Sequence, residues 1–323
     1  MDFKRPLRKI DDFQQRHGTL GFPLAVVTKF GDDHAGNLAA LIAYYAFFSI
    51  FPLLLVLVTV LGIVLHNDPS LQHRIVNSAL VDFPVIGDQL KSNIGSLNKT
   101  GAGLIIGLIG TFWGARGIAN AAQNAFNSIW EVPYKDRPGF PFNQLRSIAM
   151  IGVVGVGVLV TTALSAIGGG TGGVGVAIRI GAIALSFVLN ASLFWLGFRL
   201  ATASTVKTRE LRFGAVLAAI VWQILQAIGG YLVAHTLKNS SGVYGVFGLV
   251  LGLLSWLYLQ AQFTIYAVEV DIVRQRKLWP RALIAPPLTK GDERAYEAYA
   301  EVEQRRDPQD IDLDVNEPVR REQ

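Results

Sequence analysis

The sequence predicts an all-α integral membrane protein with six transmembrane helices and both termini in the cytoplasm. Of its 323 residues, 51% are hydrophobic and 16% are charged, whereas soluble domains carry about 25% charged residues. Apolar runs of twenty or more residues recur from residue 38 to residue 273, and each could cross a hydrocarbon core about 30 Å thick as a helix. The connections between these runs differ strongly in Lys and Arg content, which gives the orientation.

Residues 1–37 are expected to form a basic segment on the inner membrane surface. Basic and apolar positions alternate here, for example at Lys4, Leu7, Arg8 and Ile10. This pattern is typical of segments that bind anionic lipid headgroups. The start of the chain has no apolar core and no small-residue cleavage site of a secretory signal, so we expect it to stay in the cytoplasm.

Residues 38–285 are expected to form one membrane domain. The predicted spans are 38–65, 103–130, 146–167, 174–200, 211–236 and 244–273. Helices are favoured because backbone groups in lipid must be paired within their own segment. Two of these spans carry a G-x-x-x-G pair, Gly110 with Gly114 and Gly248 with Gly252, which predicts close packing between helices.

The distribution of Lys and Arg predicts the orientation of the spans. Sixteen of these residues fall in 1–37, 131–146, 201–212 and 274–281, and four fall in the connections of the other side. Because cytoplasmic connections are enriched in Lys and Arg, both termini are expected inside. This orientation requires an even number of spans, in agreement with six.

Two segments outside the spans have their own character. Residues 66–100 are partly amphipathic and contain Pro84, so we expect one or two short helices lying over the outer face. Residues 286–323 hold 11 of the 24 acidic residues and few large apolar ones. They are expected to form a disordered cytoplasmic tail, with room for a short helix near Glu293–Glu303.

A polar stripe runs down one face of the second predicted span. Its members, spaced as on one helix face, are Arg116, Asn120, Gln123, Asn124 and Asn127. An arginine near the middle of a membrane costs a few kcal/mol, so it should face the helix bundle or a hydrated cavity. A guanidinium beside amide groups suits a phosphate or carboxylate.

Polar residues on other predicted spans occur at a similar depth and could line the same hydrated cavity, open to the cytoplasm. They are Tyr44, Tyr45, Ser49, Gln223, Gln226, Gln262, Tyr266 and Glu269. This arrangement predicts a transporter or flippase-like carrier of an anionic or amphiphilic solute, in contact with membrane lipids. Its oligomeric state is not predicted.

Two other function classes stay open beside the carrier. In the first, the stripe only holds the bundle together, and the protein is a membrane scaffold or an envelope-assembly factor. In the second, an intramembrane enzyme acts on lipid with Glu269 and Tyr266 as its reactive groups. We expect no enzyme, because only these two residues support one.

The residue inventory argues against several other chemistries. The chain has no cysteine, which excludes disulfides, thiolate catalysis and cysteine metal sites. The five histidines are scattered without ligand spacing, so we expect no metal and no cofactor. The pI near 9.4 follows from cytoplasmic connections rich in Lys and Arg, and we expect no nucleic-acid partner.

Several stretches carry a resemblance to a known family. They are AALIAYYAFFSIFPLLLVLVTVLG (39–62), NAAQNAFNSIWEVPYKDRPGF (120–140), FGAVLAAIVWQILQ (213–226) and SSGVYGVFGLVLGLLSWLYLQAQFTIYAVEVD (240–271). The chain resembles the YihY/BrkB family of bacterial inner-membrane proteins, once labelled ribonuclease BN. The resemblance implies a six-helix protein of the bacterial inner membrane and suggests transport of lipids or lipid-linked precursors. It supplies no catalytic residues.

Overall fold

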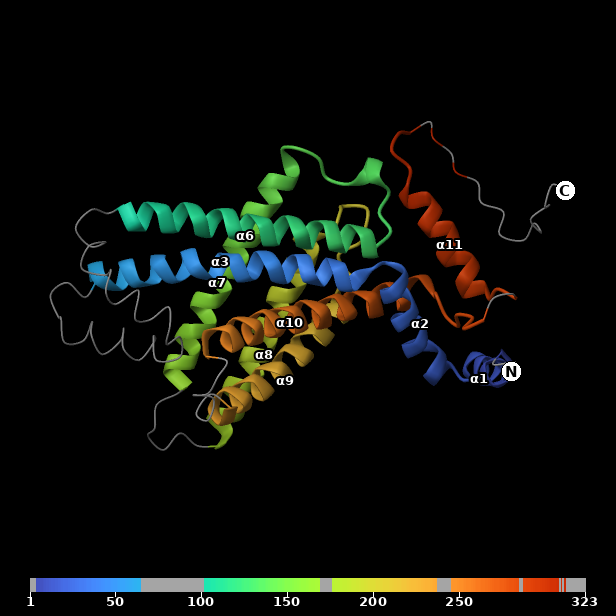
Figure 1. Ribbon diagram of the computed structural model, residues 1–323, viewed down its shortest axis with the longest axis horizontal. Helices are drawn as coiled ribbons and strands as arrows, with labels where there is room; N and C mark the ends of the chain where they lie inside the picture. The colour runs from blue at the N-terminus through green and yellow to red at the C-terminus, as the bar shows by residue number, and fades with distance from the viewer. Residues whose placement is uncertain are drawn as a thin grey trace. The chain divides into compact units, whose positions relative to one another are not determined.

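The computed structural model describes residues 4–64, 102–168, 176–236, 245–284, 287–307, 309 and 311. Within these ranges the chain is helical and contains no strand (Figure 1). The predicted all-α class is therefore confirmed for the described residues. The predicted outer segment 66–100 lies outside the described residues.

Six long helices stand where the sequence predicts its six spans. They are α3 (Ala35–Val64), α6 (Ala102–Ile129), α7 (Phe142–Gly168), α8 (Val176–Ala201), α9 (Arg212–Thr236) and α10 (Gly245–Arg276). The remaining helical elements are α1 (Lys4–Arg16), α2 (Gly18–Asp32), α11 (Lys290–Val302) and the 3-10 turn η1 (Tyr134–Asp136). The ends of the six long helices agree with the ends of the predicted spans to within a few residues. The reason is that each helix follows an apolar run and ends at a charged connection.

Three stretches in the described residues are long and apolar enough to cross a membrane. They are Ala35–Leu53 in α3, Ala184–Ala201 in α8 and Val250–Arg276 in α10, and Arg212–Gln226 in α9 is a shorter apolar stretch. The protein thus has several candidate spans, and the full six-span topology with its orientation remains a prediction from the sequence.

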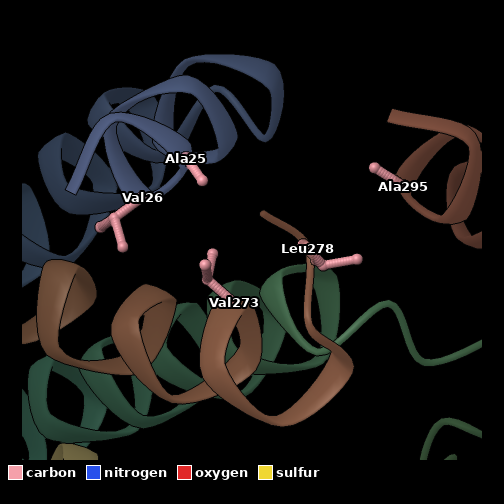
Figure 2. Close-up of a cluster of buried hydrophobic side chains, with 5 residues drawn as sticks. All are labelled: Ala25, Val26, Val273, Leu278 and Ala295. Carbon is pink, nitrogen blue, oxygen red and sulfur yellow. The ribbon is translucent and has the colours of Figure 1, made fainter. Parts of the chain in front are cut away.

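The described residues form two compact units. Unit 1 comprises 1–39, 119–229 and 260–323, and unit 2 comprises 40–118 and 230–259. The core of unit 1 joins the N-terminal helix α2 to the end of α10 and to α11. Figure 2 shows the five buried side chains of this cluster, which are Ala25, Val26, Val273, Leu278 and Ala295.

The predicted disordered tail contains a packed helix. Helix α11 begins with a capping box, in which the Thr289 side chain accepts from the Asp292 N–H and the Asp292 carboxylate accepts from the Thr289 N–H. Ala295 and Ala298 are buried. The packed part of the chain therefore extends to Val302, and α11 lies where the sequence left room for a short helix near Glu293–Glu303. The capping box and the buried alanines are enough to hold this helix in place, although large apolar residues are few in this part of the chain.

Unit 2 contains a tight contact between α3 and α6, which run antiparallel side by side (Figure 1). A Cβ atom added at Gly110 would lie 2.9 Å from Pro52, and one added at Gly114 would lie 2.6 Å from the Ser49 Cβ. Gly117 faces the Tyr45 ring in the same way. The close packing predicted for the first glycine pair is confirmed, whereas a Cβ at Gly252 would meet nothing within 4 Å.

Candidate functional site: a basic cleft and a buried charge cluster

Three members of the predicted polar stripe hold helices of unit 1 together. The Gln123 side chain donates to the Ser147 hydroxyl of α7 at 2.8 Å, and that hydroxyl lies 2.9 Å from the Asn120 Oδ1. Asn127 accepts from the Ala203 N–H at 2.8 Å and donates to the Gln123 carbonyl. These amides thus satisfy backbone and hydroxyl groups of neighbouring segments.

The other two members of the stripe have different surroundings. Asn124 is exposed. Arg116 lies in unit 2 and is half-buried, with its guanidinium carbon 5.9 Å from the centroid of the Trp113 ring. Its Nε atom is buried and has no hydrogen-bond partner among the described residues.

The remaining predicted residues are spread over both units. In unit 2, Tyr44 is exposed, Tyr45 packs against Gly117, and the Ser49 hydroxyl donates to the Ala46 carbonyl of its own helix. In unit 1, Gln223 and Gln262 are half-buried and Gln226 is exposed. The Tyr266 ring stacks on Phe30 at 3.9 Å between centroids.

A cleft of about 740 Å³ opens in unit 1 at the end of the candidate span of α10. Its walls are largely apolar, and three cations stand among them. The lining residues are Phe22, Phe213, Leu217, Val270, Arg274, Lys277, Trp279 and Arg294. An apolar wall combined with positive charge and no acidic lining residue suits an anionic amphiphile.

Contacts with the protein hold two of these cations at the cleft. The Arg274 guanidinium carbon lies 4.5 Å from the centroid of the Phe213 ring, and Arg294 donates to the Lys277 carbonyl at 3.0 Å. None of the three cations forms an ion pair with a described residue. Their charges are therefore available to a ligand.

A second feature of unit 1 is a cluster of buried charges around Lys29. The Lys29 ammonium lies 2.6 Å from Asp33, 3.1 Å from Glu131 and 3.9 Å from Glu269. The side chains of Lys29, Glu131 and Glu269 have no exposed surface. Glu131 also pairs with Arg276 at 2.8 Å, and this arginine is 38% exposed.

The cluster changes the acid–base properties of its members outside the span. Burial lowers the pKa of Lys29, but the charges of Glu269, Glu131 and Asp33 outweigh it and raise the pKa above its ordinary value. Burial also raises the pKa of Asp33, and this effect exceeds the opposite effect of the Lys29 charge. The lysine is thus held charged, whereas the Asp33 carboxylate is disfavoured.

Sequence reasoning found Glu269 but missed its partners and the cleft. Arg274 and Lys277 entered the prediction only as charges that orient the spans. One signal was available: Lys29 stands alone in the apolar stretch FPLAVVTKF, where a charge needs a partner. The partners themselves are distant in the sequence and could not be assigned.

Comparisons with known proteins identify the family of the chain. The profile of the family described as "Virulence factor BrkB" matches residues 26–290. Among curated proteins, "Inner membrane protein YhjD" of Escherichia coli is 26% identical over 289 residues, which cover 83% of this chain and 85% of that relative. No solved structure gives a significant match.

Two further relatives show how widely the similarity extends. "Putative ribonuclease-like protein YfkH" of Bacillus subtilis is 26% identical over 274 residues, or 75% of this chain and 91% of the relative. A UPF0761 membrane protein of Pseudomonas paraeruginosa is 25% identical over 270 residues, or 80% of this chain and 64% of the relative. With its long apolar helices and a profile match over most of its length, the chain belongs to the BrkB family, also known as YihY/BrkB, and is a membrane protein.

Proposed function

We propose that this protein is a bacterial inner-membrane carrier that binds and moves an anionic lipid. The observation that supports the proposal is the cleft at the end of α10, where apolar walls adjoin Arg274, Lys277 and Arg294. A phosphate-bearing headgroup would contact the cations, while acyl chains would contact Phe22, Phe213 and Leu217. The name of the E. coli relative supports the inner membrane as the location.

Binding is tested with purified protein in detergent and phosphatidylglycerol, with phosphatidylcholine as the zwitterionic comparison, by native mass spectrometry. The triple variant R274Q/K277Q/R294Q removes the three cations. Each basic residue near an anionic lipid surface contributes about 1 kcal/mol, so we expect phosphatidylglycerol binding to weaken on the order of 100-fold. The binding of phosphatidylcholine should change little.

The matched control is K207Q/R209Q/R306Q, which removes the same charge from exposed positions outside the cleft lining. This control should bind phosphatidylglycerol as the wild type does. Equal weakening in both triple variants, or equal binding of both lipids by the wild type, would show that the cleft is not the site.

Carriage is tested separately in proteoliposomes, by the movement of labelled phosphatidylglycerol between leaflets. We expect the wild type to accelerate this movement relative to empty liposomes. Arg116 is the proposed contact for the headgroup within the membrane, because its buried Nε has no partner among the described residues. R116Q should therefore slow translocation while cleft binding persists. A wild type no faster than empty liposomes would refute carriage.

A second candidate function is a non-transporting scaffold for envelope assembly. The observation that favours it is that Asn120, Gln123 and Asn127 bind groups of neighbouring segments. On this account, R116Q and N127A would lower thermal stability in detergent together, and the wild type would translocate no lipid.

A further inference from the structure

The buried cluster around Lys29 contains more negative than positive charge. Three carboxylates, from Asp33, Glu131 and Glu269, face one buried lysine, and Arg276 is partly in contact with solvent. A buried charge without full compensation costs several kcal/mol, and such groups take up a proton instead. The geometry of the cluster shows which carboxyl group is the least compensated.

Of the three carboxyl groups, Glu269 has the fewest contacts that would stabilise a negative charge. Its nearest cation contact, to Lys29 at 3.9 Å, is the longest of the three lysine contacts. Both of its carboxyl oxygens are buried and receive no hydrogen bond from any described residue. A fully buried carboxyl group that receives no hydrogen bond from the described residues thus points into the cluster.

The Glu269 and Asp33 carboxyl groups lie beside each other at the Lys29 ammonium, at 3.9 Å and 2.6 Å from it. Ionised carboxylates can only accept hydrogen bonds, so two of them in contact repel unless one holds a proton. With a proton on Glu269, its hydroxyl would donate to the Asp33 carboxylate. The Lys29 ammonium, 2.6 Å from Asp33 on its other side, would stabilise the remaining negative charge.

The cluster reaches solvent at Arg276, which pairs with Glu131 and is 38% exposed, and at Asp33, whose side chain is 6% exposed. A second cleft, of about 280 Å³, is lined by Glu131, Arg276, Glu210 and Asp136 among others. Glu131 pairs with Lys29 and thereby joins this cleft to the interior of the cluster. The remaining groups near Lys29 are the Tyr299 ring, 5.4 Å away, and Asp32, whose carboxylate lies 3.4 Å from the Tyr299 hydroxyl.

We propose that Glu269 and Asp33 form a proton-binding site that exchanges its proton with water at Asp33, whose side chain is 6% exposed. Lys29 stays charged and fixes the site. Neither group needs a metal ion, and no group of three or more His, Asp or Glu in the described ranges is placed to hold one. Proton binding at this site does not depend on lipid carriage.

The test is infrared difference spectroscopy of the purified protein, recorded between mildly acidic and alkaline pH. A protonated carboxyl group gives a C=O band that an ionised one lacks. We expect a wild-type band that disappears at alkaline pH, and its loss in E269Q, where the amide replaces the protonated acid with the same shape. D33N should shift or remove the same band because it changes the acceptor.

Two variants control for other buried acids. D11N removes a buried carboxylate of α1 that accepts from Gln14 at 2.9 Å, outside the cluster, and should leave the band unchanged. D271N removes the other buried acid of α10, which accepts from the Gly214 N–H at 2.8 Å, and so identifies any signal from that group. A band that persists in the double variant E269Q/D33N, or a wild type without any titrating band beyond that of Asp271, would overturn the proposal. Unaltered thermal stability of E269Q would confirm that the fold is kept.

Discussion

Glu131 adopts the left-handed backbone conformation that is usually found for glycine. Its φ is 52°, and it directly follows the last turn of α6, where the Val132 N–H reaches the Asn127 carbonyl and the Glu131 N–H reaches the Ser128 carbonyl. This is the hydrogen-bond pattern of a Schellman motif, and a side chain there costs about 1 kcal/mol or more. The glutamate is consistent with a need for its carboxylate between Lys29 and Arg276.

Replacing Glu131 by glycine relieves the strained backbone conformation and at the same time removes the carboxylate from its ion pairs. Relief of the backbone should stabilise the protein by about 1 kcal/mol, whereas the loss of a buried carboxylate from its pairs costs about 3–5 kcal/mol. We therefore expect E131G to lower the free energy of unfolding by about 2–4 kcal/mol, measured by denaturant titration in detergent.

His34 provides the matched control for this substitution. It has a φ of 50° after α2 and is exposed. H34G relieves the same strain without removing a buried charge, so it should leave stability unchanged or slightly higher. Equal losses in H34G and E131G would mean that the Glu131 carboxylate contributes nothing.

Asp292 couples the attachment of α11 to pH. Burial raises the pKa of Asp292, but hydrogen bonds from Thr289, Ala282 and Arg281 outweigh it and hold the pKa below its ordinary value of 3.8. The stability from this carboxylate is fully present above the ordinary pKa, and it is lost as pH falls through the lower pKa of the folded state.

We therefore expect α11 to detach in acid below this range, as seen by faster hydrogen exchange at Ala295 and Ala298. D292N should show fast exchange already at neutral pH and little further change in acid. D307N, which alters a side chain that is 97% exposed, should behave as the wild type. Acid detachment that is the same in D292N and in the wild type would rule out Asp292 as its cause.

At the scale of elements, the contact between α3 and α6 depends on the absence of side chains. A methyl group at Gly114 would lie 2.6 Å from the Ser49 Cβ and 3.0 Å from its Cα, so the helices would have to separate. Overpacking of this kind costs about 1–3 kcal/mol. We expect G114A to lower the unfolding temperature in detergent, while G252A, which meets nothing within 4 Å, changes it little. A loss in both variants would point to a general intolerance of alanine.

The sequence predicted the long helices well and the packing of the chain ends poorly. Spans follow from the length of apolar runs, which is a local property, so the bounds of α7 and α9 came within a few residues. Helix α11 is acidic and its buried residues are alanines, so composition alone suggested disorder. Its stability depends on Arg281, whose partnership with Asp292 appears only in three dimensions.

At the scale of the whole molecule, the candidate site needed contacts that sequence patterns do not encode. The stripe on α6 was visible as a helical period, yet three of its amides bind groups of neighbouring segments such as Ser147 and Ala203, and the buried Arg116 Nε has no hydrogen-bond partner among the described residues. The cleft combines residues of α2, α9, α10 and α11. Arg274 and Lys277 had been used only to orient the spans, which required their number and not their position, and Arg294 had no predicted role.

The predicted orientation can be tested directly because the chain has no cysteine. Single cysteines at the exposed positions Arg8, Ser204 and Arg305 should react with a membrane-impermeant maleimide in inside-out vesicles and resist it in intact spheroplasts. Ser96→Cys, in the predicted outer segment, should show the reverse. Labelling of the first three from outside would refute the assignment of both termini to the cytoplasm.

The core shown in Figure 2 joins the beginning of the chain to its end. The ribosome releases Ala25 and Val26 long before Val273, Leu278 and Ala295 are made. Throughout most of translation, therefore, the apolar face of α2 has no residues to pack against, while the hydrophobic helices are inserted one after another. A nascent chain that stops before residue 273 lacks all three of these partners and leaves the apolar face of α2 uncovered.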